Sequence, residues 1–247
     1  MLLTIFGNGV MANAMIAGLL EHGFNIEVFG RDEKKLQTLS ERFRSQVIVS
    51  VYEKGVDISG KNVILCVKPY ALDEVAQYIK GRASTLFSVL AGTTIEKLQE
   101  SVKAAHYVRA MPNIAAMFGK STTTLTGDKE SKEKALKIFG AIGKTLWVGS
   151  EKELDTATIL AGSAPAFLAL VAESLIDGGV KEGLKREDAS FLAQGLFESF
   201  SALLDNYSHP SLIKDAVMSP NGITAKGYAV LEDYKVRSAF IKVYKGI

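Results

Sequence analysis

The residues with the clearest chemical meaning are three small ones in a turn near the start of the chain, Gly7, Gly9 and Ala12. This Gly-x-Gly-x-x-Ala pattern follows an apolar run of strand length and precedes a helix-like stretch, residues 11–21. Gly7 permits the sharp turn, Gly9 lets a pyrophosphate approach the backbone, and Ala12 lets the helix lie close to the strand. Free N–H groups at the helix start favour phosphates. The pattern predicts a dinucleotide site, and its alternative is a purely structural turn.

The residues after the second predicted strand, 25–29, indicate which dinucleotide binds. NAD sites of this type place Asp or Glu there to hold the ribose hydroxyls. This chain has Gly30 and then Arg31, with Lys34 close behind. A guanidinium without an acid suits the 2′-phosphate of NADP, so NADPH is predicted to be preferred over NADH. Asp32 is interpreted as the N-cap of the next helix, and the alternative for Arg31 is a solvated helix start.

Two later strand ends carry further residues suited to a cofactor. One apolar strand, residues 62–67, ends at Lys68, where Pro69 stops it. Lys68 suits a cofactor phosphate or ribose, and its alternative is a surface lysine. After the strand at 85–90, Ala91 and Gly92 are small enough for a nicotinamide ring to lie against the backbone, although Gly92 is equally suited to a turn.

Another strand end reads Arg109-Ala110-Met111-Pro112-Asn113. Pro112 marks the exit from the strand, and Met111 is interpreted as core packing. Asn113 has two interpretations, a cap for the segment that follows or a hydrogen-bond donor to a ligand, and capping is the commoner role.

Polar and turn-forming residues gather before the last predicted helix, residues 224–243. They include Ser219, Asn221, Gly222 and Thr224. The N–H groups of a helix start, with the Ser219 and Thr224 hydroxyls, form a small anion pocket suited to a carboxylate. The alternative is a simple N-cap by Thr224 or Asn221.

Composition excludes several classes of function. The chain has 247 residues, 47% of them hydrophobic and 23% charged, with a net charge of +2. No basic stripe with aromatic residues predicts nucleic-acid binding. No apolar run reaches the ~18 residues that cross a bilayer, and no signal peptide is recognised, so a cytoplasmic protein without a membrane span is expected. The single cysteine and three scattered histidines predict neither an internal disulfide nor a metal site.

Two sequence patterns divide the chain near residue 150. The first part alternates strand-like and helix-like segments, which predicts an α/β fold with a mostly parallel sheet and helices on both faces. The predicted domains are an NAD(P)-binding Rossmann domain, residues 1–149, and a helical dimerisation and substrate-binding domain, residues 150–247. The other strands of the first part are expected at 46–51, 106–111, 121–126 and 145–148, and its helices at 33–43, 71–80, 94–102 and 129–142.

Two long apolar helices are predicted in the second part. The first spans residues 152–177 and ends at Gly178-Gly179, and the second follows Arg186 and reaches Leu204. Pro165 is expected to kink or loosen the first helix. Both helices are apolar on more than one face. Together they carry more apolar surface than a region of this length can bury alone. A dimer interface is therefore predicted.

Several separated motifs, taken together, resemble the pyrroline-5-carboxylate reductase family. They are GNGVMANAM near the start, VKP at 67–69, AGTT at 91–94, RAMPN at 109–113, GSAPAF at 162–167 and SPNGITAKGYAVLE at 219–232. The resemblance implies a Rossmann domain, a helical dimerisation domain, and a homodimer or a larger homo-oligomer of dimers. It also implies reduction of 1-pyrroline-5-carboxylate to L-proline, the last step of proline biosynthesis, with NAD(P)H.

The resemblance also implies roles for individual residues. It places cofactor phosphates at Gly7, Asn8, Gly9, Val10 and Met11, the 2′-phosphate near Arg31, the ribose and nicotinamide near Val67, Lys68, Ala91 and Gly92, and further cofactor contacts at Met111 and Pro112. It places the substrate carboxylate on Ser219, Gly222 and Ile223, and Thr224 near the ring nitrogen as a hydrogen-bond donor or proton relay. The chain departs from the family pattern at Ala164, Asn221 and Ile223, where the family usually has Gly, Gly and Thr.

Two other functions share part of this pattern. A β-hydroxyacid-type dehydrogenase, or another NADP-dependent imine reductase, has the same two-domain plan. The β-hydroxyacid enzymes use a lysine on the long inter-domain helix, and this chain has none between Lys152 and Lys181. A non-catalytic NADP-binding paralogue would bind NADPH without turnover, and the three departures would then mark lost activity.

Overall fold

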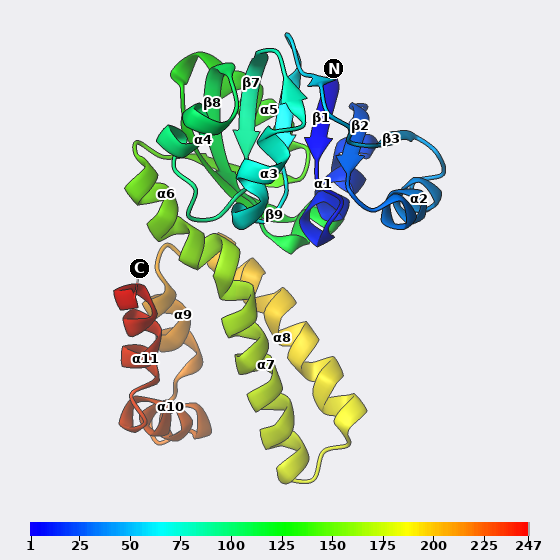
Figure 1. The fold of residues 1–247 in the computed structure, drawn as a ribbon. Coiled ribbons are helices and arrows are strands. Elements are labelled where there is room, and N and C mark those ends of the chain that lie inside the picture. Colours follow the sequence, from blue (N-terminus) through cyan, green and yellow to red (C-terminus); the bar gives the residue numbers. More distant parts are fainter. Residues whose placement is uncertain (247) are drawn as a thin grey trace. The chain divides into compact units, whose positions relative to one another are not determined.

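The computed structural model describes residues 1–246, which form two compact units, Met1–Ser163 and the chain from Ala164 onward (Figure 1). The first unit is α/β and the second is helical, as the sequence predicts. The domain boundary expected at residue 149 stays a prediction, since the compact units divide at Ser163.

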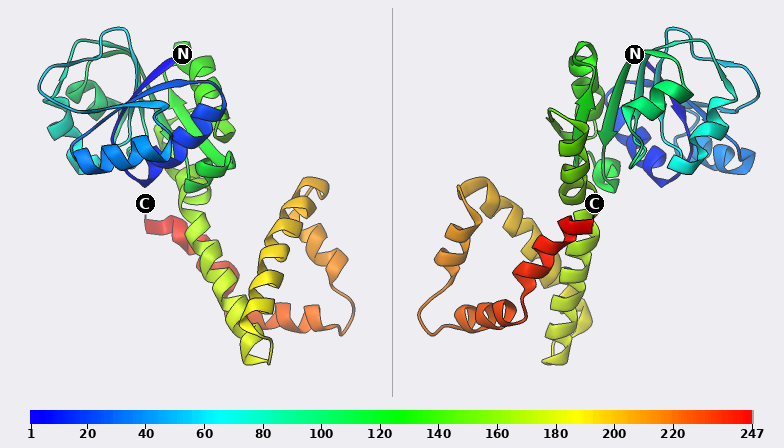
Figure 2. Two further views of the ribbon diagram at one scale, coloured as in Figure 1. Left: turned by 90° about the vertical axis from the view of Figure 1, so that its right-hand side faces the viewer. Right: turned by 60° about the vertical axis from the view of Figure 1, so that its left-hand side comes forward.

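The first unit is built on an eight-stranded sheet with the strand order β10-β9-β8-β7-β5-β1-β2-β3. Figure 1 labels several of these strands, and Figure 2 shows the same unit in two further views. Every neighbouring pair is parallel except β8 and β9. A separate short parallel pair joins β4 and β6. The strands are β1 (Leu2–Phe6), β2 (Asn25–Gly30), β3 (Val47–Val51), β4 (Val56–Asp57), β5 (Asn62–Leu65), β6 (Ile79–Lys80), β7 (Ala83–Ser88), β8 (Ala104–Met111), β9 (Ser121–Gly127) and β10 (Gly143–Trp147).

Apolar side chains on both faces of the sheet form two hydrophobic cores. Ile5 and Phe6 are fully buried neighbours on β1 that belong to different cores, because successive strand side chains point to opposite faces. The first core also takes side chains from α1 (Val10–Glu21), α2 (Glu33–Arg42) and α5 (Lys132–Gly140), and the second from α3 (Leu72–Ala76) and α4 (Ile95–Ser101). Burial on both faces explains why these strands read as continuous apolar runs.

One predicted helix of the first unit is wrong in part. The sequence predicts a helix over residues 71–80, but α3 ends at Ala76 and Ile79 lies in β6. Ile79 pairs with Val56 of β4, so the ladder with a distant segment overrides the local helical pattern.

The second unit consists of helices α7 (Ala164–Lys181), α8 (Arg186–Asn206), α9 (Pro210–Val217), α10 (Ile223–Asp233) and α11 (Val236–Lys242). Three details differ from the sequence prediction. Helix α7 passes through Gly178-Gly179 and ends at Lys181, and Gly183 makes the turn with φ of +104°. The single last helix is divided in two at Lys235, which has φ of +58°. Helix α9 is not predicted at all.

Helical structure continues from α6 (Glu151–Thr158) through a π-helical turn, Ile159–Ser163, into α7. The π turn lies directly before Pro165, where the sequence predicts a loosened helix. By length and composition the 31-residue run Glu151–Lys181 could cross a bilayer, so the expected absence of a membrane span stays a prediction. Such helices also occur in interfaces and cores of proteins that span no membrane, and only 6% of its most apolar window is buried here.

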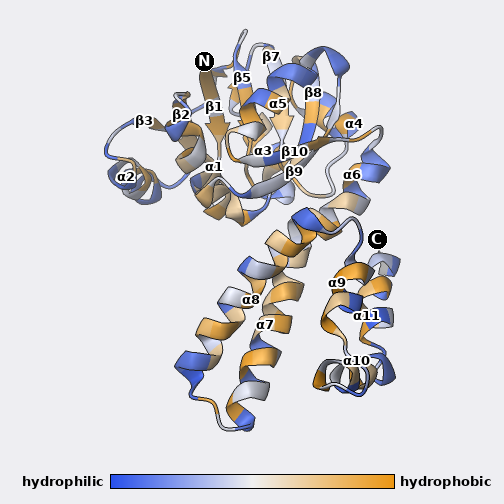
Figure 3. Ribbon diagram, turned by 180° about the vertical axis from the view of Figure 1, so that it is seen from behind, coloured by the Kyte–Doolittle hydropathy of each residue, from blue (hydrophilic) through white to orange (hydrophobic). Residues whose placement is uncertain are grey.

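Helices α7 and α8 expose much of their apolar surface. No residue of α7 is buried, and Leu170 is 65% exposed. On α8, Phe191 is 77% exposed. Figure 3 shows hydrophobic segments on both helices. No other part of the described chain packs over these side chains, which agrees with the predicted interface.

Candidate functional site

The predicted phosphate-binding turn lies between β1 and α1 and depends on Gly7. Gly7 has φ of +117°, and an added Cβ would lie 2.7 Å from the carbonyl carbon of Cys66. Its N–H donates to the Phe29 carbonyl at 2.8 Å, while the Cys66 N–H donates to the Phe6 carbonyl at 2.8 Å. The turn is therefore packed between the ends of β1, β2 and the segment after β5, with no room for a side chain.

Gly9 lies on the open side of the same turn. An added Cβ would meet nothing within 4 Å. Gly9 is the N-cap of the 12-residue helix α1, and no side chain caps the helix there. Val10, the first helical residue, is 70% exposed. The N–H groups of the first turn are thus accessible to phosphate oxygens, as a dinucleotide requires.

A buried polar atom without a partner supports the same assignment. The Asn8 amide nitrogen has no hydrogen-bond partner among the described residues. It lies 3.0 Å from the place that a Gly30 Cβ would take, so Gly30 keeps the space beside it open. Buried polar groups are normally hydrogen-bonded. An oxygen of a bound ribose or phosphate would satisfy this amide, so the residues present fit a dinucleotide.

Arg31 follows the last residue of β2, where the sequence places the 2′-phosphate. Its exposed guanidinium Nη1 donates to both carboxylate oxygens of Glu74, at 2.9 and 3.0 Å. This hydrogen bonding raises the pKa of Arg31 further above its usual value. Asp32 accepts from the Lys35 N–H at 3.1 Å and so caps α2, as predicted.

The other predicted cofactor residues follow strands at the same edge of the sheet. Val67 and Lys68 follow β5, and Ala91 and Gly92 follow β7. Lys68, Ala91 and Gly92 are exposed, and an added Cβ at Gly92 would meet nothing within 4 Å. Because β7, β5, β1 and β2 are neighbours, their carboxyl ends bring these loops together with Gly7, Gly9 and Arg31.

Met111 and Pro112, at the end of β8, are buried. Met111 is only 4% exposed, which agrees with its interpretation as core packing. Their predicted cofactor contacts stay predictions.

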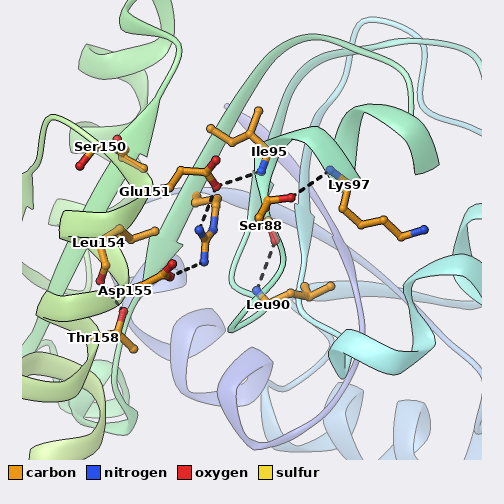
Figure 4. Close-up of polar contacts among 12 residues, drawn as sticks. Ser88, Leu90, Ile95, Lys97, Ser150, Glu151, Leu154, Asp155 and Thr158 are labelled. Carbon is orange, nitrogen blue, oxygen red and sulfur yellow. Dashed lines mark hydrogen bonds and ion pairs between the residues drawn. The ribbon is translucent and has the colours of Figure 1, made fainter. Parts of the chain in front are cut away.

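The role of Arg109 is not predicted from the sequence. Its side chain is fully buried, and it donates to Glu151 Oε1 and Asp155 Oδ1, both at 2.8 Å. Glu151 Oε1 also accepts from the N–H of Ile95 at 2.9 Å (Figure 4). The start of α6 is thereby tied to β8 and to α4, directly after the loop with Ala91 and Gly92. An arginine inside an apolar strand, with two acids four residues apart on a later helix, was the available signal.

Asn113 uses both ends of its amide within the protein. Its Oδ1 accepts from the Ala115 N–H at 3.0 Å, which caps the 3-10 helix Ile114–Phe118. Its Nδ2 donates to the Ala161 carbonyl at 2.8 Å, in the π turn. Pro165, four residues after Ala161, has no N–H to offer this carbonyl, so Asn113 supplies the donor. Of its two interpretations, the structure supports the cap.

The predicted substrate residues lie in the second unit, at the start of α10. Asn221 has φ of +59°, a conformation that Asn tolerates better than most residues. Gly222 is the N-cap of α10, and a Cβ there would overlap the Ser219 hydroxyl. No side chain caps α10, so the alternative of a simple cap by Thr224 or Asn221 is wrong.

The start of α10 is therefore open. Ser219 and Thr224 are exposed, and Ile223 is 91% exposed. The free N–H groups and the two hydroxyls can receive a small anion such as a carboxylate.

Comparison with known proteins identifies the family. The family model for pyrroline-5-carboxylate reductase dimerisation matches residues 151–246, and the model for NADP oxidoreductases, coenzyme F420-dependent, matches residues 2–92. Pyrroline-5-carboxylate reductase of Helicobacter pylori is 36% identical, covering 98% of this chain and 95% of the relative. This chain belongs to the pyrroline-5-carboxylate reductase family. The family and fold class predicted from sequence are confirmed, and the chain is an oxidoreductase.

Other members of the family support this membership. Pyrroline-5-carboxylate reductase of Thermus thermophilus is 34% identical, covering 97% of this chain and 93% of the relative. The crystal structure of the Streptococcus pyogenes reductase has a TM-score of 0.87 at 26% identity, covering 99% of this chain and 95% of that one. The Plasmodium falciparum reductase, solved with NADP bound, has a TM-score of 0.83 at 26% identity, covering 99% and 96%.

Proposed function

We propose that this chain reduces 1-pyrroline-5-carboxylate to L-proline, with NADPH preferred over NADH. Its similarity to pyrroline-5-carboxylate reductases over 98% of its length carries the proposal. The open helix start at Gly9 and the Asn8 amide without a partner support the cofactor part. We also place the reaction in the cytoplasm. We propose a homodimer or larger homo-oligomer of dimers, because the dimerisation region exposes many large apolar side chains.

The first unit binds and orients the dinucleotide in this proposal. The turn at Gly7 and the first N–H groups of α1 receive the pyrophosphate, and Arg31 receives the 2′-phosphate. Lys68, Ala91 and Gly92 lie beside the ribose and nicotinamide. When bound, NADPH supplies a hydride, with its electron pair, to the C=N carbon of the substrate.

The open start of α10 binds the substrate in this proposal. Ser219 and the N–H groups of Ile223 and Thr224 hold the carboxylate, so binding at Ile223 does not need the hydroxyl that other family members have. A cyclic imine is basic, so the ring nitrogen arrives partly protonated and the iminium needs no strong acid. Thr224 donates a hydrogen bond to the ring nitrogen of the neutral imine, or relays the proton that forms the iminium.

A turnover assay tests this proposal directly. Purified protein is mixed with NADPH and 1-pyrroline-5-carboxylate, and the loss of nicotinamide absorbance is followed. Parallel reactions use NADH in place of NADPH, or a β-keto acid in place of the imine. Oxidation of NADPH with the imine but not with the β-keto acid supports the reductase. Oxidation with the β-keto acid alone would favour the dehydrogenase alternative, and NADPH binding without turnover would favour the non-catalytic paralogue.

A further inference from the structure

Arg31 forms an ion pair with Glu74 in the structure. Glu74 lies on α3, 43 residues after Arg31 in the sequence. Both of its carboxylate oxygens accept a hydrogen bond from the same guanidinium nitrogen of Arg31. Both side chains are exposed, Arg31 by 58% and Glu74 by 44%. Water and a bound ligand can therefore reach both partners, and the pair can open when another anion arrives.

Glu74 brings a carboxylate to the guanidinium of Arg31. In Rossmann sites for NAD an acid follows the second strand and holds the ribose hydroxyls. Here β2 is followed by Arg31, and the carboxylate comes from α3, which follows β5. The cofactor edge thus holds both an Arg suited to a 2′-phosphate and an acid beside it.

We propose that Glu74 determines how strongly this chain prefers NADPH over NADH, by competing with the 2′-phosphate for Arg31. The proposal rests on the role of Arg31 in the proposed function. A 2′-phosphate must displace the Glu74 carboxylate and then lie near its negative charge, which weakens NADPH binding. NADH has no 2′-phosphate, so it binds without breaking the Arg31–Glu74 ion pair. Glu74 therefore reduces a preference that Arg31 alone would make larger.

The neighbouring charges leave Glu74 as the competing anion. Asp32 caps α2 and lies 3.9 Å from Lys35, and Asp73 pairs with Lys97 at 2.9 Å. Tyr52 lies near Arg31, but burial raises the pKa of Tyr52, so its phenol is neutral at neutral pH. Among residues 1–246, Glu74 is the acid that the structure pairs with Arg31.

The test is Glu74→Gln, which removes the charge and keeps the size of the side chain. Asp73→Asn is the matched control, because it removes one charge from the preceding residue of α3, and Asp73 pairs with Lys97 rather than with Arg31. Calorimetry measures the Kd of NADP⁺ and NAD⁺, and steady-state assays measure kcat/KM with NADPH and NADH.

We expect Glu74→Gln to tighten NADP⁺ binding by about 3- to 10-fold. The ratio of kcat/KM with NADPH to kcat/KM with NADH should rise by the same factor. The Kd for NAD⁺ and the Asp73→Asn ratio should stay within about 2-fold of the wild type, and added salt should reduce the effect. An unchanged ratio in Glu74→Gln, or an equal rise in Asp73→Asn, would overturn the proposal.

A third variant, Arg31→Gln, separates this inference from the proposed function. If Arg31 binds the 2′-phosphate, Arg31→Gln weakens NADP⁺ binding and leaves NAD⁺ binding unchanged. Normal NADP⁺ affinity in Arg31→Gln would show that Arg31 does not bind the 2′-phosphate, and it would overturn the inference about Glu74 as well. Loss of NADP⁺ affinity in Arg31→Gln together with no change in Glu74→Gln would overturn the inference alone.

Discussion

At the scale of the residue, Gly7 and Gly9 predict opposite outcomes for the same substitution. Gly7→Ala should lower the free energy of unfolding by more than about 2 kcal/mol, because a Cβ would meet the Cys66 carbonyl at a φ that favours Gly. Gly9→Ala should fold normally, since its Cβ has open space and φ is −78°. That Cβ would occupy the path of the pyrophosphate and weaken NADPH binding by at least about 10-fold.

Urea denaturation and a fluorescence titration with NADPH measure these two effects separately. Normal NADPH affinity in Gly9→Ala would contradict the placement of the phosphates.

The Thr224 hydroxyl predicts a second outcome at this scale. Thr224→Val keeps the shape of the side chain and removes the hydroxyl, so kcat/KM for the imine should fall about 10-fold or more. Thr224→Ser keeps the hydroxyl and should retain most of the activity. The KM for NADPH should not change in either variant. Steady-state kinetics measure all three, and wild-type kcat/KM in Thr224→Val would show that the hydroxyl has no role.

At the scale of the element, Arg109 joins strand β8 to helix α6. Arg109→Met leaves Glu151 and Asp155 without their cation, and we expect a loss of about 2–4 kcal/mol in the free energy of unfolding. The value lies at the lower end for buried pairs because Glu151 and Asp155 are 34% and 42% exposed and can regain water. Arg109→Lys keeps the charge but cannot reach both acids, so it should recover only part of the loss.

Urea denaturation measures this prediction, with Arg186→Met as the control. Arg186 makes an exposed ion pair with Asp177, so its loss should change stability little. Equal stability of Arg109→Met and wild type would mean that the buried pair contributes nothing.

At the scale of the whole molecule, the exposed apolar faces of α7 and α8 predict self-association. Leu170→Glu or Phe191→Glu should reduce the molar mass in solution to that of one chain, because a buried unpaired charge disrupts an apolar interface. Ile48→Glu is the control, since Ile48 is 66% exposed on β3 of the first unit. Light scattering after gel filtration measures the mass. A wild-type monomer, or no change in the α7 and α8 variants, would contradict the predicted oligomer.

Much of the backbone was predictable from the sequence, because local patterns determine it. The turn at Gly7 and Gly9, the parallel strands and the helical second half follow from apolar periodicity and from the special conformations of Gly and Pro. The cap at Asp32 and the loosened helix at Pro165 are equally local. The four strands that precede most of the predicted cofactor residues, β7, β5, β1 and β2, are neighbours in the sheet, as parallel pairing predicts, and the roles of those residues stay predictions.

The pairing of distant side chains was decided only by the tertiary structure. Strand order brings Glu74 to Arg31, and Glu151 and Asp155 to Arg109, across separations of at least 42 residues. The ladder between Val56 and Ile79 ends a helix that the local pattern predicted. Such contacts depend on which strands and helices become neighbours, and local periodicity does not carry that information. The sequence therefore determined where a dinucleotide site is predicted, and the tertiary structure decided which charges surround that predicted site.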